Sequence, residues 1–231
     1  MPQATGEFAV QPLCTNRLIS LPGRREVHVY LYPAGGMAAC IPSRPSRGDR
    51  FMRYYPVHSG YPSYAEVNRA IEAVFAEHGR GDVQMPPKVY VALVESGDFR
   101  TMPAYLPKLG LAGVKIVNVN PHNRVRGLPT VMALTVFIDV GTGAPTAIIN
   151  ATELTAMRTG AAGAVAARYL APRQTITLGV IGAGRQTEAL VEATIAALTV
   201  EEIRVWSRTE KSAEAFAARY ADYNARSVPI E

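Results

Sequence analysis

A lysine lies within an apolar stretch near the middle of the chain. Lys115 follows Val114 and precedes Ile116 in the segment GVKIVNV, whose β-branched residues are typical of a strand. An ammonium there must be exposed, paired or chemically active, because buried lysines without a partner are rare. In an apolar site its pKa falls, which suits proton transfer. The alternative is a strand lysine whose stem covers apolar surface while its ammonium reaches water.

A second chemical pattern begins at Gly182. Gly182, Gly184 and Thr187 occupy the three positions of a G-x-G-x-x-G fingerprint, directly after an apolar segment and at the start of an expected helix. The first glycine allows a tight turn, and the second lets backbone N–H groups approach a pyrophosphate. Thr187 departs from the strict fingerprint. The context favours dinucleotide binding over a glycine turn with a purely structural role.

The residues after the next expected strand bear on which dinucleotide binds. An NAD-preferring site offers Asp or Glu to the ribose hydroxyls at this point. Here Ser207, Arg208 and Thr209 come first, and a carboxylate follows only at Glu210. A guanidinium beside two hydroxyls suits a 2′-phosphate. We therefore expect NADP(H) to be favoured, with NAD(H) possible, unless Arg208 is only a solvated loop residue.

The N-terminal half predicts an irregular segment followed by a sheet. Residues 1–60 contain many prolines without a helical period, and we expect an irregular extension with one short strand at 26–32. Ser63 and Glu66 form a capping box that begins an amphipathic helix. Strand-like segments then follow one another without helices between them, which predicts a mostly antiparallel or mixed sheet. They are residues 88–94, 111–119, 129–138 and 144–150.

The C-terminal part predicts a different architecture. Residues 151–172 read as a long helix of small residues, in which Gly160 and Gly163 permit close approach of another backbone or a ligand, or serve tight helix packing alone. Strands at 176–181 and 203–206 then alternate with helices at 184–198 and 210–220, as in a parallel sheet. The fold class is therefore α/β: an α+β domain at 61–172, followed by a partial Rossmann dinucleotide-binding domain at 173–231.

Composition narrows the class of protein. The chain is 48% hydrophobic and 19% charged, which is ordinary for a globular protein. Its formal charge of +5 is concentrated in residues 1–55, where seven arginines face three acidic residues. A nucleic-acid-binding arm there is a weaker alternative, so we expect neither nucleic-acid nor membrane binding. The two cysteines, Cys14 and Cys40, and four scattered histidines predict no metal site and a cytoplasmic location.

Five segments, in this order, resemble the ornithine cyclodeaminase/mu-crystallin family, which includes alanine dehydrogenase and cyclic ketimine reductase branches. They are MPPK (85–88), GVKIVNVNP (113–121), GLPTVMALTVFIDVGTGAP (127–145), TAMRTGAA (155–162) and VIGAGRQTEA (180–189). Together they extend over about residues 64–220.

The resemblance implies roles for individual residues. Lys115 matches a catalytic lysine near the substrate carboxylate and the reacting carbon, and Lys88 matches a basic residue that holds the carboxylate. Arg158 matches an arginine shared by substrate and cofactor, and Thr130 matches a contact near the nicotinamide. The positions matched to the cofactor's phosphates and adenosine end are Gly182, Gly184, Arg185, Gln186, Ser207, Arg208 and Thr209.

The resemblance also implies an activity. Family members transfer a hydride between a nicotinamide and the α-carbon of an amino or imino acid, as in ketimine reduction, ornithine cyclodeamination or alanine dehydrogenation. The NADP-like residues move ketimine reduction, for example of pyrroline-2-carboxylate, slightly ahead. The alternative is a non-catalytic protein that binds NADPH or a small ligand, because the family includes a crystallin.

Two further expectations concern the whole molecule. Family members extend past the position that matches Glu231, and the aspartate that serves as acid or base on the substrate nitrogen lies in that part. We therefore expect a C-terminally truncated member with only two parallel strands in its nucleotide-binding sheet and an unpaired edge. The resemblance also implies a homodimer formed through the sheet of the first domain.

Overall fold

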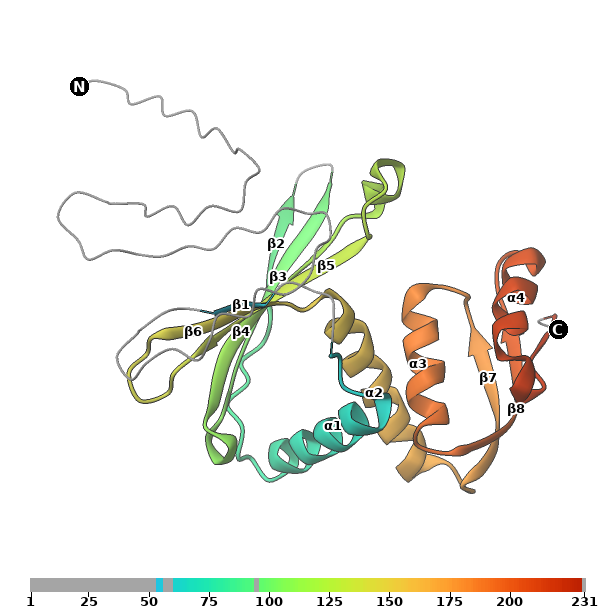
Figure 1. Ribbon diagram of the computed structural model, residues 1–231, viewed down its shortest axis with the longest axis horizontal. Helices are drawn as coiled ribbons and strands as arrows, with labels where there is room; N and C mark the ends of the chain where they lie inside the picture. The colour runs from blue at the N-terminus through green and yellow to red at the C-terminus, as the bar shows by residue number, and fades with distance from the viewer. Residues whose placement is uncertain (1–52, 56–59, 94–95, 230–231) are drawn as a thin grey trace.

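The computed structural model describes residues 53–55, 60–93 and 96–229. Two sheets lie on either side of packed helices (Figure 1). This is the α/β class expected from the sequence. The predicted strand at 26–32 and the basic segment before residue 53 lie outside the described residues. In the part that is described, no helix is long and apolar enough to cross a membrane.

The larger sheet has six strands in the order β1-β6-β5-β4-β3-β2. Only β1 and β6 pair in parallel, so the predicted mixed, mostly antiparallel sheet is confirmed. Its strands are β1 (Arg53–Tyr55), β2 (Val89–Leu93), β3 (Gly97–Leu106), β4 (Leu111–Val119), β5 (Val131–Ile138) and β6 (Pro145–Asn150). Short 3-10 helices at Pro107–Leu109 and Pro121–Arg126 follow β3 and β4.

The sequence interpretation missed two of these strands. β3 contains Asp98, Arg100 and Pro103, so it lacks the apolar run that marked its neighbours. β3 pairs with β2 on one side and β4 on the other, and these backbone hydrogen bonds stabilise a strand that its own composition does not favour. β1 has three residues and is defined only by its partner β6.

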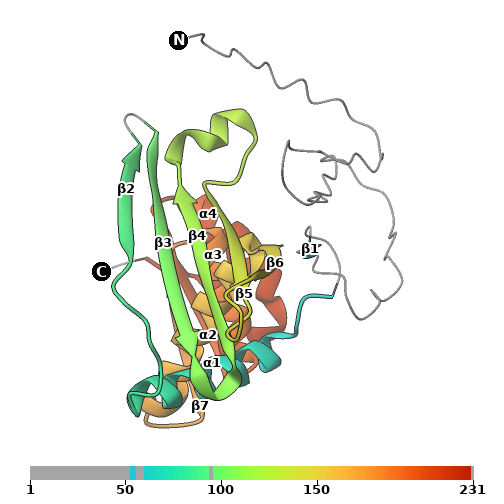
Figure 2. The ribbon, with the colours of Figure 1, turned by 90° about the vertical axis from the view of Figure 1, so that its left-hand side faces the viewer.

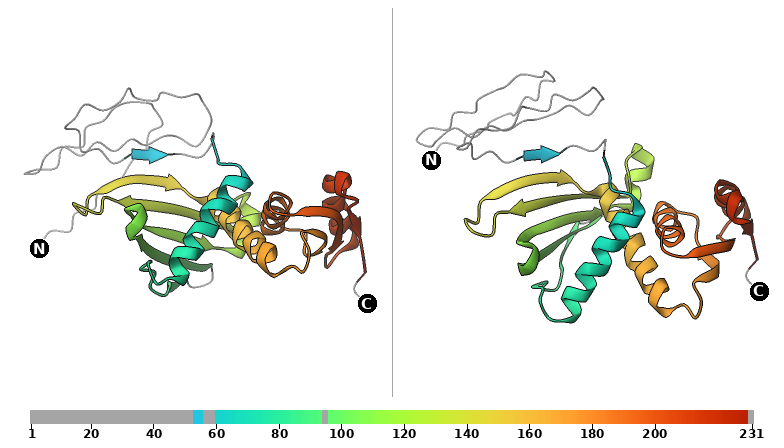
Figure 3. Two further views of the ribbon diagram at one scale, coloured as in Figure 1. Left: turned by 90° about the horizontal axis from the view of Figure 1, so that it is seen from below. Right: turned by 60° about the horizontal axis from the view of Figure 1, so that its bottom comes forward.

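Helices α1 (Tyr64–Gly79) and α2 (Thr152–Leu170) connect the two halves. The predicted capping box is present: the Ser63 hydroxyl accepts the Glu66 N–H, and the Glu66 carboxylate accepts the Ser63 N–H. Val67 of α1 packs against Met157 and Ala161 of α2. Figure 3 shows both helices between the larger sheet and the C-terminal unit.

The predicted close approach at Gly160 is present. A Cβ at this position would lie 2.1 Å from the backbone oxygen of Ala189 in α3 (Arg185–Ile195), so only glycine lets the two helices pack this closely. A Cβ at Gly163 would meet only the Leu190 Cδ2 atom, at 2.7 Å. At Gly160 and Gly163, α2 therefore packs closely against α3, which joins the C-terminal unit to the first.

The C-terminal unit has three parallel strands in the order β7-β8-β9. They are β7 (Thr175–Ile181), β8 (Thr199–Trp206) and β9 (Arg226–Ser227). The expectation of two parallel strands was therefore wrong: β9 has two residues, too few to leave a hydrophobic pattern. Helix α4 (Glu210–Ala217) and a 3-10 helix (Ala218–Tyr223) cover the sheet, and Ile203, Val205 and Phe216 form its core.

The two faces of the larger sheet differ in what covers them. On the face that carries Lys115 and Val117, the inner face, Val117 and Ala133 pack with Ala151 at the start of α2. None of the helices that the structure describes lies over the opposite, outer face in Figure 2. Its side chains include Val89, Val91, Ile116 and Leu134, and three of these are exposed.

Candidate functional site

Lys115 lies on the inner face of the sheet, in the middle of β4. It pairs with Met102 of β3 and Thr135 of β5, so strands flank it on both sides. Its neighbour on the same face, Val117, is buried under the start of α2, and Lys115 itself is partly buried. The alternation of side chains along the strand therefore turns the ammonium toward α2.

Two cationic side chains from other elements act on Lys115. Burial, the Arg158 guanidinium of α2 and the Lys88 ammonium before β2 together lower the pKa of Lys115 to about 8. Burial also lowers the pKa of Arg158, although solvent reaches its side chain. The Arg158 side chain is exposed, so its guanidinium is only partly desolvated. The structure thus places Lys88 and Arg158, two of the residues expected to bind the substrate, close enough to Lys115 for their charges to act on its ammonium.

The geometry at the glycine turn fits a bound dinucleotide. Gly182 has φ of +100°, a conformation that residues with a side chain rarely adopt, and its N–H donates to the Trp206 carbonyl at the end of β8. Gly184 is the N-cap of α3, and a Cβ added to it would meet no atom within 4 Å. The turn therefore leaves open space at a helix N-terminus, where backbone N–H groups attract phosphates.

Arg185 and Gln186, both expected near the phosphates, contact α2 instead. The Arg185 guanidinium pairs with the carboxylates of Glu153 and Glu188. The Gln186 amide donates to the Ala156 carbonyl at 3.2 Å. Because Ala156 lies two residues before Arg158, these contacts set the glycine turn beside the helix that carries the third cation. The sequence offered no local sign of Glu153, whose partner is 32 residues away.

The remaining predicted residues lie on other segments of the chain. Ser207, Arg208 and Thr209 follow β8 at the edge of the glycine turn, and the hydroxyls of Thr209 and Ser212 are 2.6 Å apart. Arg208 is exposed, and within the described residues it makes no ion pair. Thr130 precedes β5, five residues before the partner of Lys115, or roughly 17 Å along the strand. Only an extended ligand could contact both Thr130 and Lys115.

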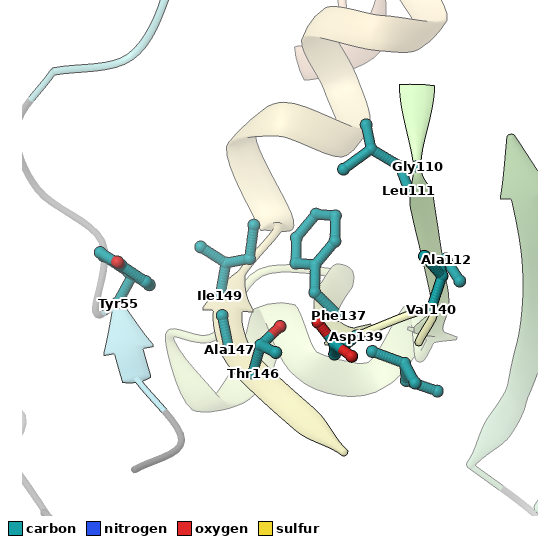
Figure 4. Close-up of a pocket in the computed structure, with 11 residues that line it drawn as sticks. Tyr55, Gly110, Leu111, Ala112, Phe137, Asp139, Val140, Thr146, Ala147 and Ile149 are labelled. Carbon is teal, nitrogen blue, oxygen red and sulfur yellow. The ribbon is translucent and has the colours of Figure 1, made fainter. Parts of the chain in front are cut away.

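A separate hollow of about 550 Å³ opens between β1, β4, β5 and β6 (Figure 4). Phe137 and Ile149 line it, and none of the predicted site residues does. Its carboxylate, Asp139, accepts the backbone N–H groups of Gly141 and Thr142 within its own turn. Among the described residues that line the hollow there is no lysine or arginine to bind an acidic ligand. Within the described part of the chain, no group of His, Cys, Asp and Glu could hold a metal ion.

Comparison with known proteins identifies related enzymes. Alanine dehydrogenase of Archaeoglobus fulgidus is 42% identical over 160 residues, which are 69% of this chain and 49% of that protein. An archaeal alanine dehydrogenase dimer solved with bound NAD superposes with a TM-score of 0.72 at 38% identity, over 77% of this chain and 56% of that one.

A second solved structure gives a similar match. Thermococcus litoralis Δ1-pyrroline-2-carboxylate reductase, in complex with NADH and L-proline, has a TM-score of 0.71 at 32% identity, over 77% of this chain and 57% of that one. This chain spans about half the length or less of the curated relatives it matches. The family model for ornithine cyclodeaminase/mu-crystallin proteins matches residues 57–230, and the chain belongs to this family.

Proposed function

We propose that the protein is a nicotinamide-dependent oxidoreductase or cyclodeaminase that acts on the α-carbon of an amino or cyclic imino acid. The observation that supports this most directly is the convergence of Lys88, Lys115 and Arg158 next to the helix that contacts the glycine turn. Within the described residues none of the three forms an ion pair. Three such cations, of which Lys115 is partly buried, suit a carboxylate.

Each residue has a chemical role in this proposal. Lys88 and Arg158 bind the substrate carboxylate, and the guanidinium can do so through two parallel N–H donors. Lys115, with its pKa near 8, exchanges a proton with the substrate at neutral pH. The bound nicotinamide supplies the hydride chemistry. Residues 61–172 would bind substrate and residues 173–231 the cofactor, with Thr130 near the nicotinamide side.

Ketimine reduction is the reaction that we place first, with ornithine cyclodeamination and alanine dehydrogenation as the other members of the class. The relatives named above include both a pyrroline-2-carboxylate reductase and alanine dehydrogenases. The competing function is binding of NADPH or a small ligand without catalysis. Its support is that the family to which this chain belongs is named for mu-crystallin as well as for ornithine cyclodeaminase.

To test the function, the 231-residue chain is mixed with NADPH and pyrroline-2-carboxylate, and the absorbance of the reduced nicotinamide is followed. We expect oxidation in the parent and none in Lys115→Ala, because removal of the ammonium leaves no group to exchange the proton. Nicotinamide fluorescence should show nearly equal NADPH binding in both. Binding without turnover in the parent supports the non-catalytic alternative, and equal turnover in Lys115→Ala contradicts the role of the lysine.

We further propose a preference for NADP(H) over NAD(H). Arg208 is exposed without an ion-pair partner in the described structure, and the hydroxyls of Ser207 and Thr209 flank it in sequence. Arg208→Ala should weaken NADPH binding by roughly tenfold or more and change NADH binding little, because a charge-assisted hydrogen bond to phosphate contributes about 1.5–3 kcal/mol. Fluorescence titration with both cofactors measures this. An unchanged ratio of the two affinities would remove the 2′-phosphate argument.

We also propose a homodimer formed through the outer face of the larger sheet. The exposed Val89, Val91 and Leu134 give this face an apolar surface that a second copy could cover. The archaeal alanine dehydrogenase relative is a dimer. A cytoplasmic location is part of the same proposal, because the amino and imino acids and reduced nicotinamides that it uses are metabolites of the cell interior.

A further inference from the structure

Tyr90 lies at the edge of the cation site and contacts two positive charges. The Lys88 Nζ atom is 5.2 Å from the centroid of the Tyr90 ring, and the Arg100 Cζ atom is 4.8 Å from the same centroid. Lys88 and Tyr90 are two residues apart, so their side chains leave the chain on the same side. The register places Tyr90 opposite Arg100, and Arg100 opposite Val117, the neighbour of Lys115 on the inner face.

The two cations on this ring differ in their remaining charge. Arg100 binds Asp98 through two hydrogen bonds, of 2.6 and 2.9 Å, so its charge is compensated within β3. The same pair lowers the pKa of Asp98, chiefly through the hydrogen bond from Arg100. Within the described residues Lys88 forms no ion pair, although its charge also helps to lower the pKa of Asp98. The ring thus presents one neutralised cation and one that can still attract an anion.

Contact with the Tyr90 ring restricts where the Lys88 ammonium can lie. A lysine side chain has four rotatable bonds and is exposed here, so on its own the ammonium would occupy many positions. The face of an aromatic ring attracts an ammonium and narrows that range. Arg100 rests on the same ring and is itself held by Asp98, which limits the movement of the ring in turn.

We propose that Tyr90 is a positioning residue that holds the ammonium of Lys88 toward Lys115 and Arg158, with the Arg100–Asp98 pair as its support. This rests on the proposed function, because the three cations are taken to bind a substrate carboxylate. Tyr90 touches neither the reacting carbon nor the cofactor in this arrangement. It acts through Lys88 alone.

One consequence can be measured without a cofactor. The charged groups that act on Lys115 are Arg158 from α2 and Lys88 from the segment before β2, while Asp98 and Arg100 of β3 compensate each other. Both acting groups are cations and lower the pKa of Lys115. If Lys88 leaves its position, one of these repulsions weakens, and the pKa of Lys115 rises toward 10.5.

The experiment compares Tyr90→Phe with Tyr90→Leu in the 231-residue chain. Reductive methylation of Lys115 as a function of pH, read by mass spectrometry, reports the pKa. Tyr90→Leu should raise it by up to about half a unit, and Tyr90→Phe, which keeps the ring face, should leave it unchanged. Binding of pyrrole-2-carboxylate, measured by calorimetry, should weaken about two- to five-fold in Tyr90→Leu only.

The outcomes separate this inference from the proposed function. A Tyr90→Leu variant with the parent's pKa and affinity overturns the positioning role, and so does a Tyr90→Phe variant that loses as much as Tyr90→Leu. If the parent itself does not bind pyrrole-2-carboxylate, the proposed function fails, while the methylation profile still decides the role of Tyr90. Lys88→Met gives the full pKa change expected when the ammonium is absent. Circular dichroism verifies that each variant is folded.

Discussion

At the scale of single residues, Lys115 shows how position alone changes a common side chain. Lys115 lies in the middle of a strand with apolar neighbours along the chain, and the charges of Arg158 and Lys88 act on its ammonium. Both influences disfavour the charged form. A carboxylate ligand would offset the repulsion from the two cations, because its negative charge would compensate the three positive charges together. The site is therefore less stable without an anion than with one.

The lowered pKa makes a prediction about stability and pH. The folded-state pKa is about 8 and the ordinary value is 10.5, so between these values the unfolded chain binds more protons than the folded one. Stability contributed by this group therefore rises with pH across that window, by at most about 1.4 kcal/mol per pH unit. Below pH 8 both states carry the proton, and the cost of the buried charge is fully present.

Lys115→Met isolates this contribution, because other groups titrate in the same range. Urea unfolding at pH 7 should show the variant more stable than the parent, and the difference should shrink as the pH rises toward 10.5. Tyr220 acts in the opposite direction at higher pH, since burial raises its pKa, but it is common to both proteins. A difference that does not change with pH would show that the ammonium is not disfavoured by the fold.

At the scale of elements, the contact between α2 and α3 connects the two halves of the site. α2 carries Arg158 and α3 begins at the glycine turn. Glu153 and Ala156 of α2 hold Arg185 and Gln186 of α3. The distance between the proposed substrate and cofactor sites therefore depends on how closely these helices pack.

Two glycines of α2 provide a matched test of this packing. In Gly160→Ala the new Cβ meets the backbone oxygen of Ala189, which cannot move alone, so we expect a loss of about 1–3 kcal/mol in unfolding free energy. In Gly163→Ala it meets the end of the Leu190 side chain, which can rotate, and alanine favours a helix by up to about 1 kcal/mol. This second variant should remain within about 1 kcal/mol of the parent.

Chemical denaturation of both variants measures the difference. Equal stability of the Gly160→Ala protein and the parent would mean that the helices lie further apart than described. The same variant should also weaken NADPH binding, because a displaced α3 moves the glycine turn away from α2.

At the scale of the whole molecule, the outer face of the larger sheet is an exposed apolar surface among the described residues. Val89 is 58% exposed, Val91 40% and Leu134 38%, and they lie on adjacent or nearby strands of one face. Burial of such a face releases about 25 cal/mol per Å² of apolar area, so a second copy would stabilise both. In such a dimer the inner face, which carries Lys115, would still be covered by the helices of its own chain.

Leu134→Lys places a charge in the centre of this face. We expect it to shift the chain from dimer to monomer in sedimentation velocity, because an unpaired ammonium buried at the interface costs several kcal/mol. Leu170→Lys is the control: Leu170 is 82% exposed at the end of α2, away from the sheet. A Leu134→Lys protein that sediments as the parent does would place the dimer contact elsewhere.

The sequence by itself determined the parts of this protein that depend on neighbours along the chain. The capping box of α1, the glycine turn and the β-branched run of β4 are local patterns, and each formed as expected. The five matching segments also identified the family. In these cases the preferred backbone conformation follows from a few consecutive residues.

Tertiary structure alone decided what depends on residues far apart in the chain. β3 and β9 exist because neighbouring strands pair with them, and their own residues do not favour a strand. The pairing of Arg185 with Glu153 and the contact of Tyr90 with Arg100 likewise cross elements. So does the effect of Arg158 and Lys88 on Lys115. Electrostatic and packing contacts fall off with distance in space rather than along the sequence, so only the folded arrangement determines which charges meet.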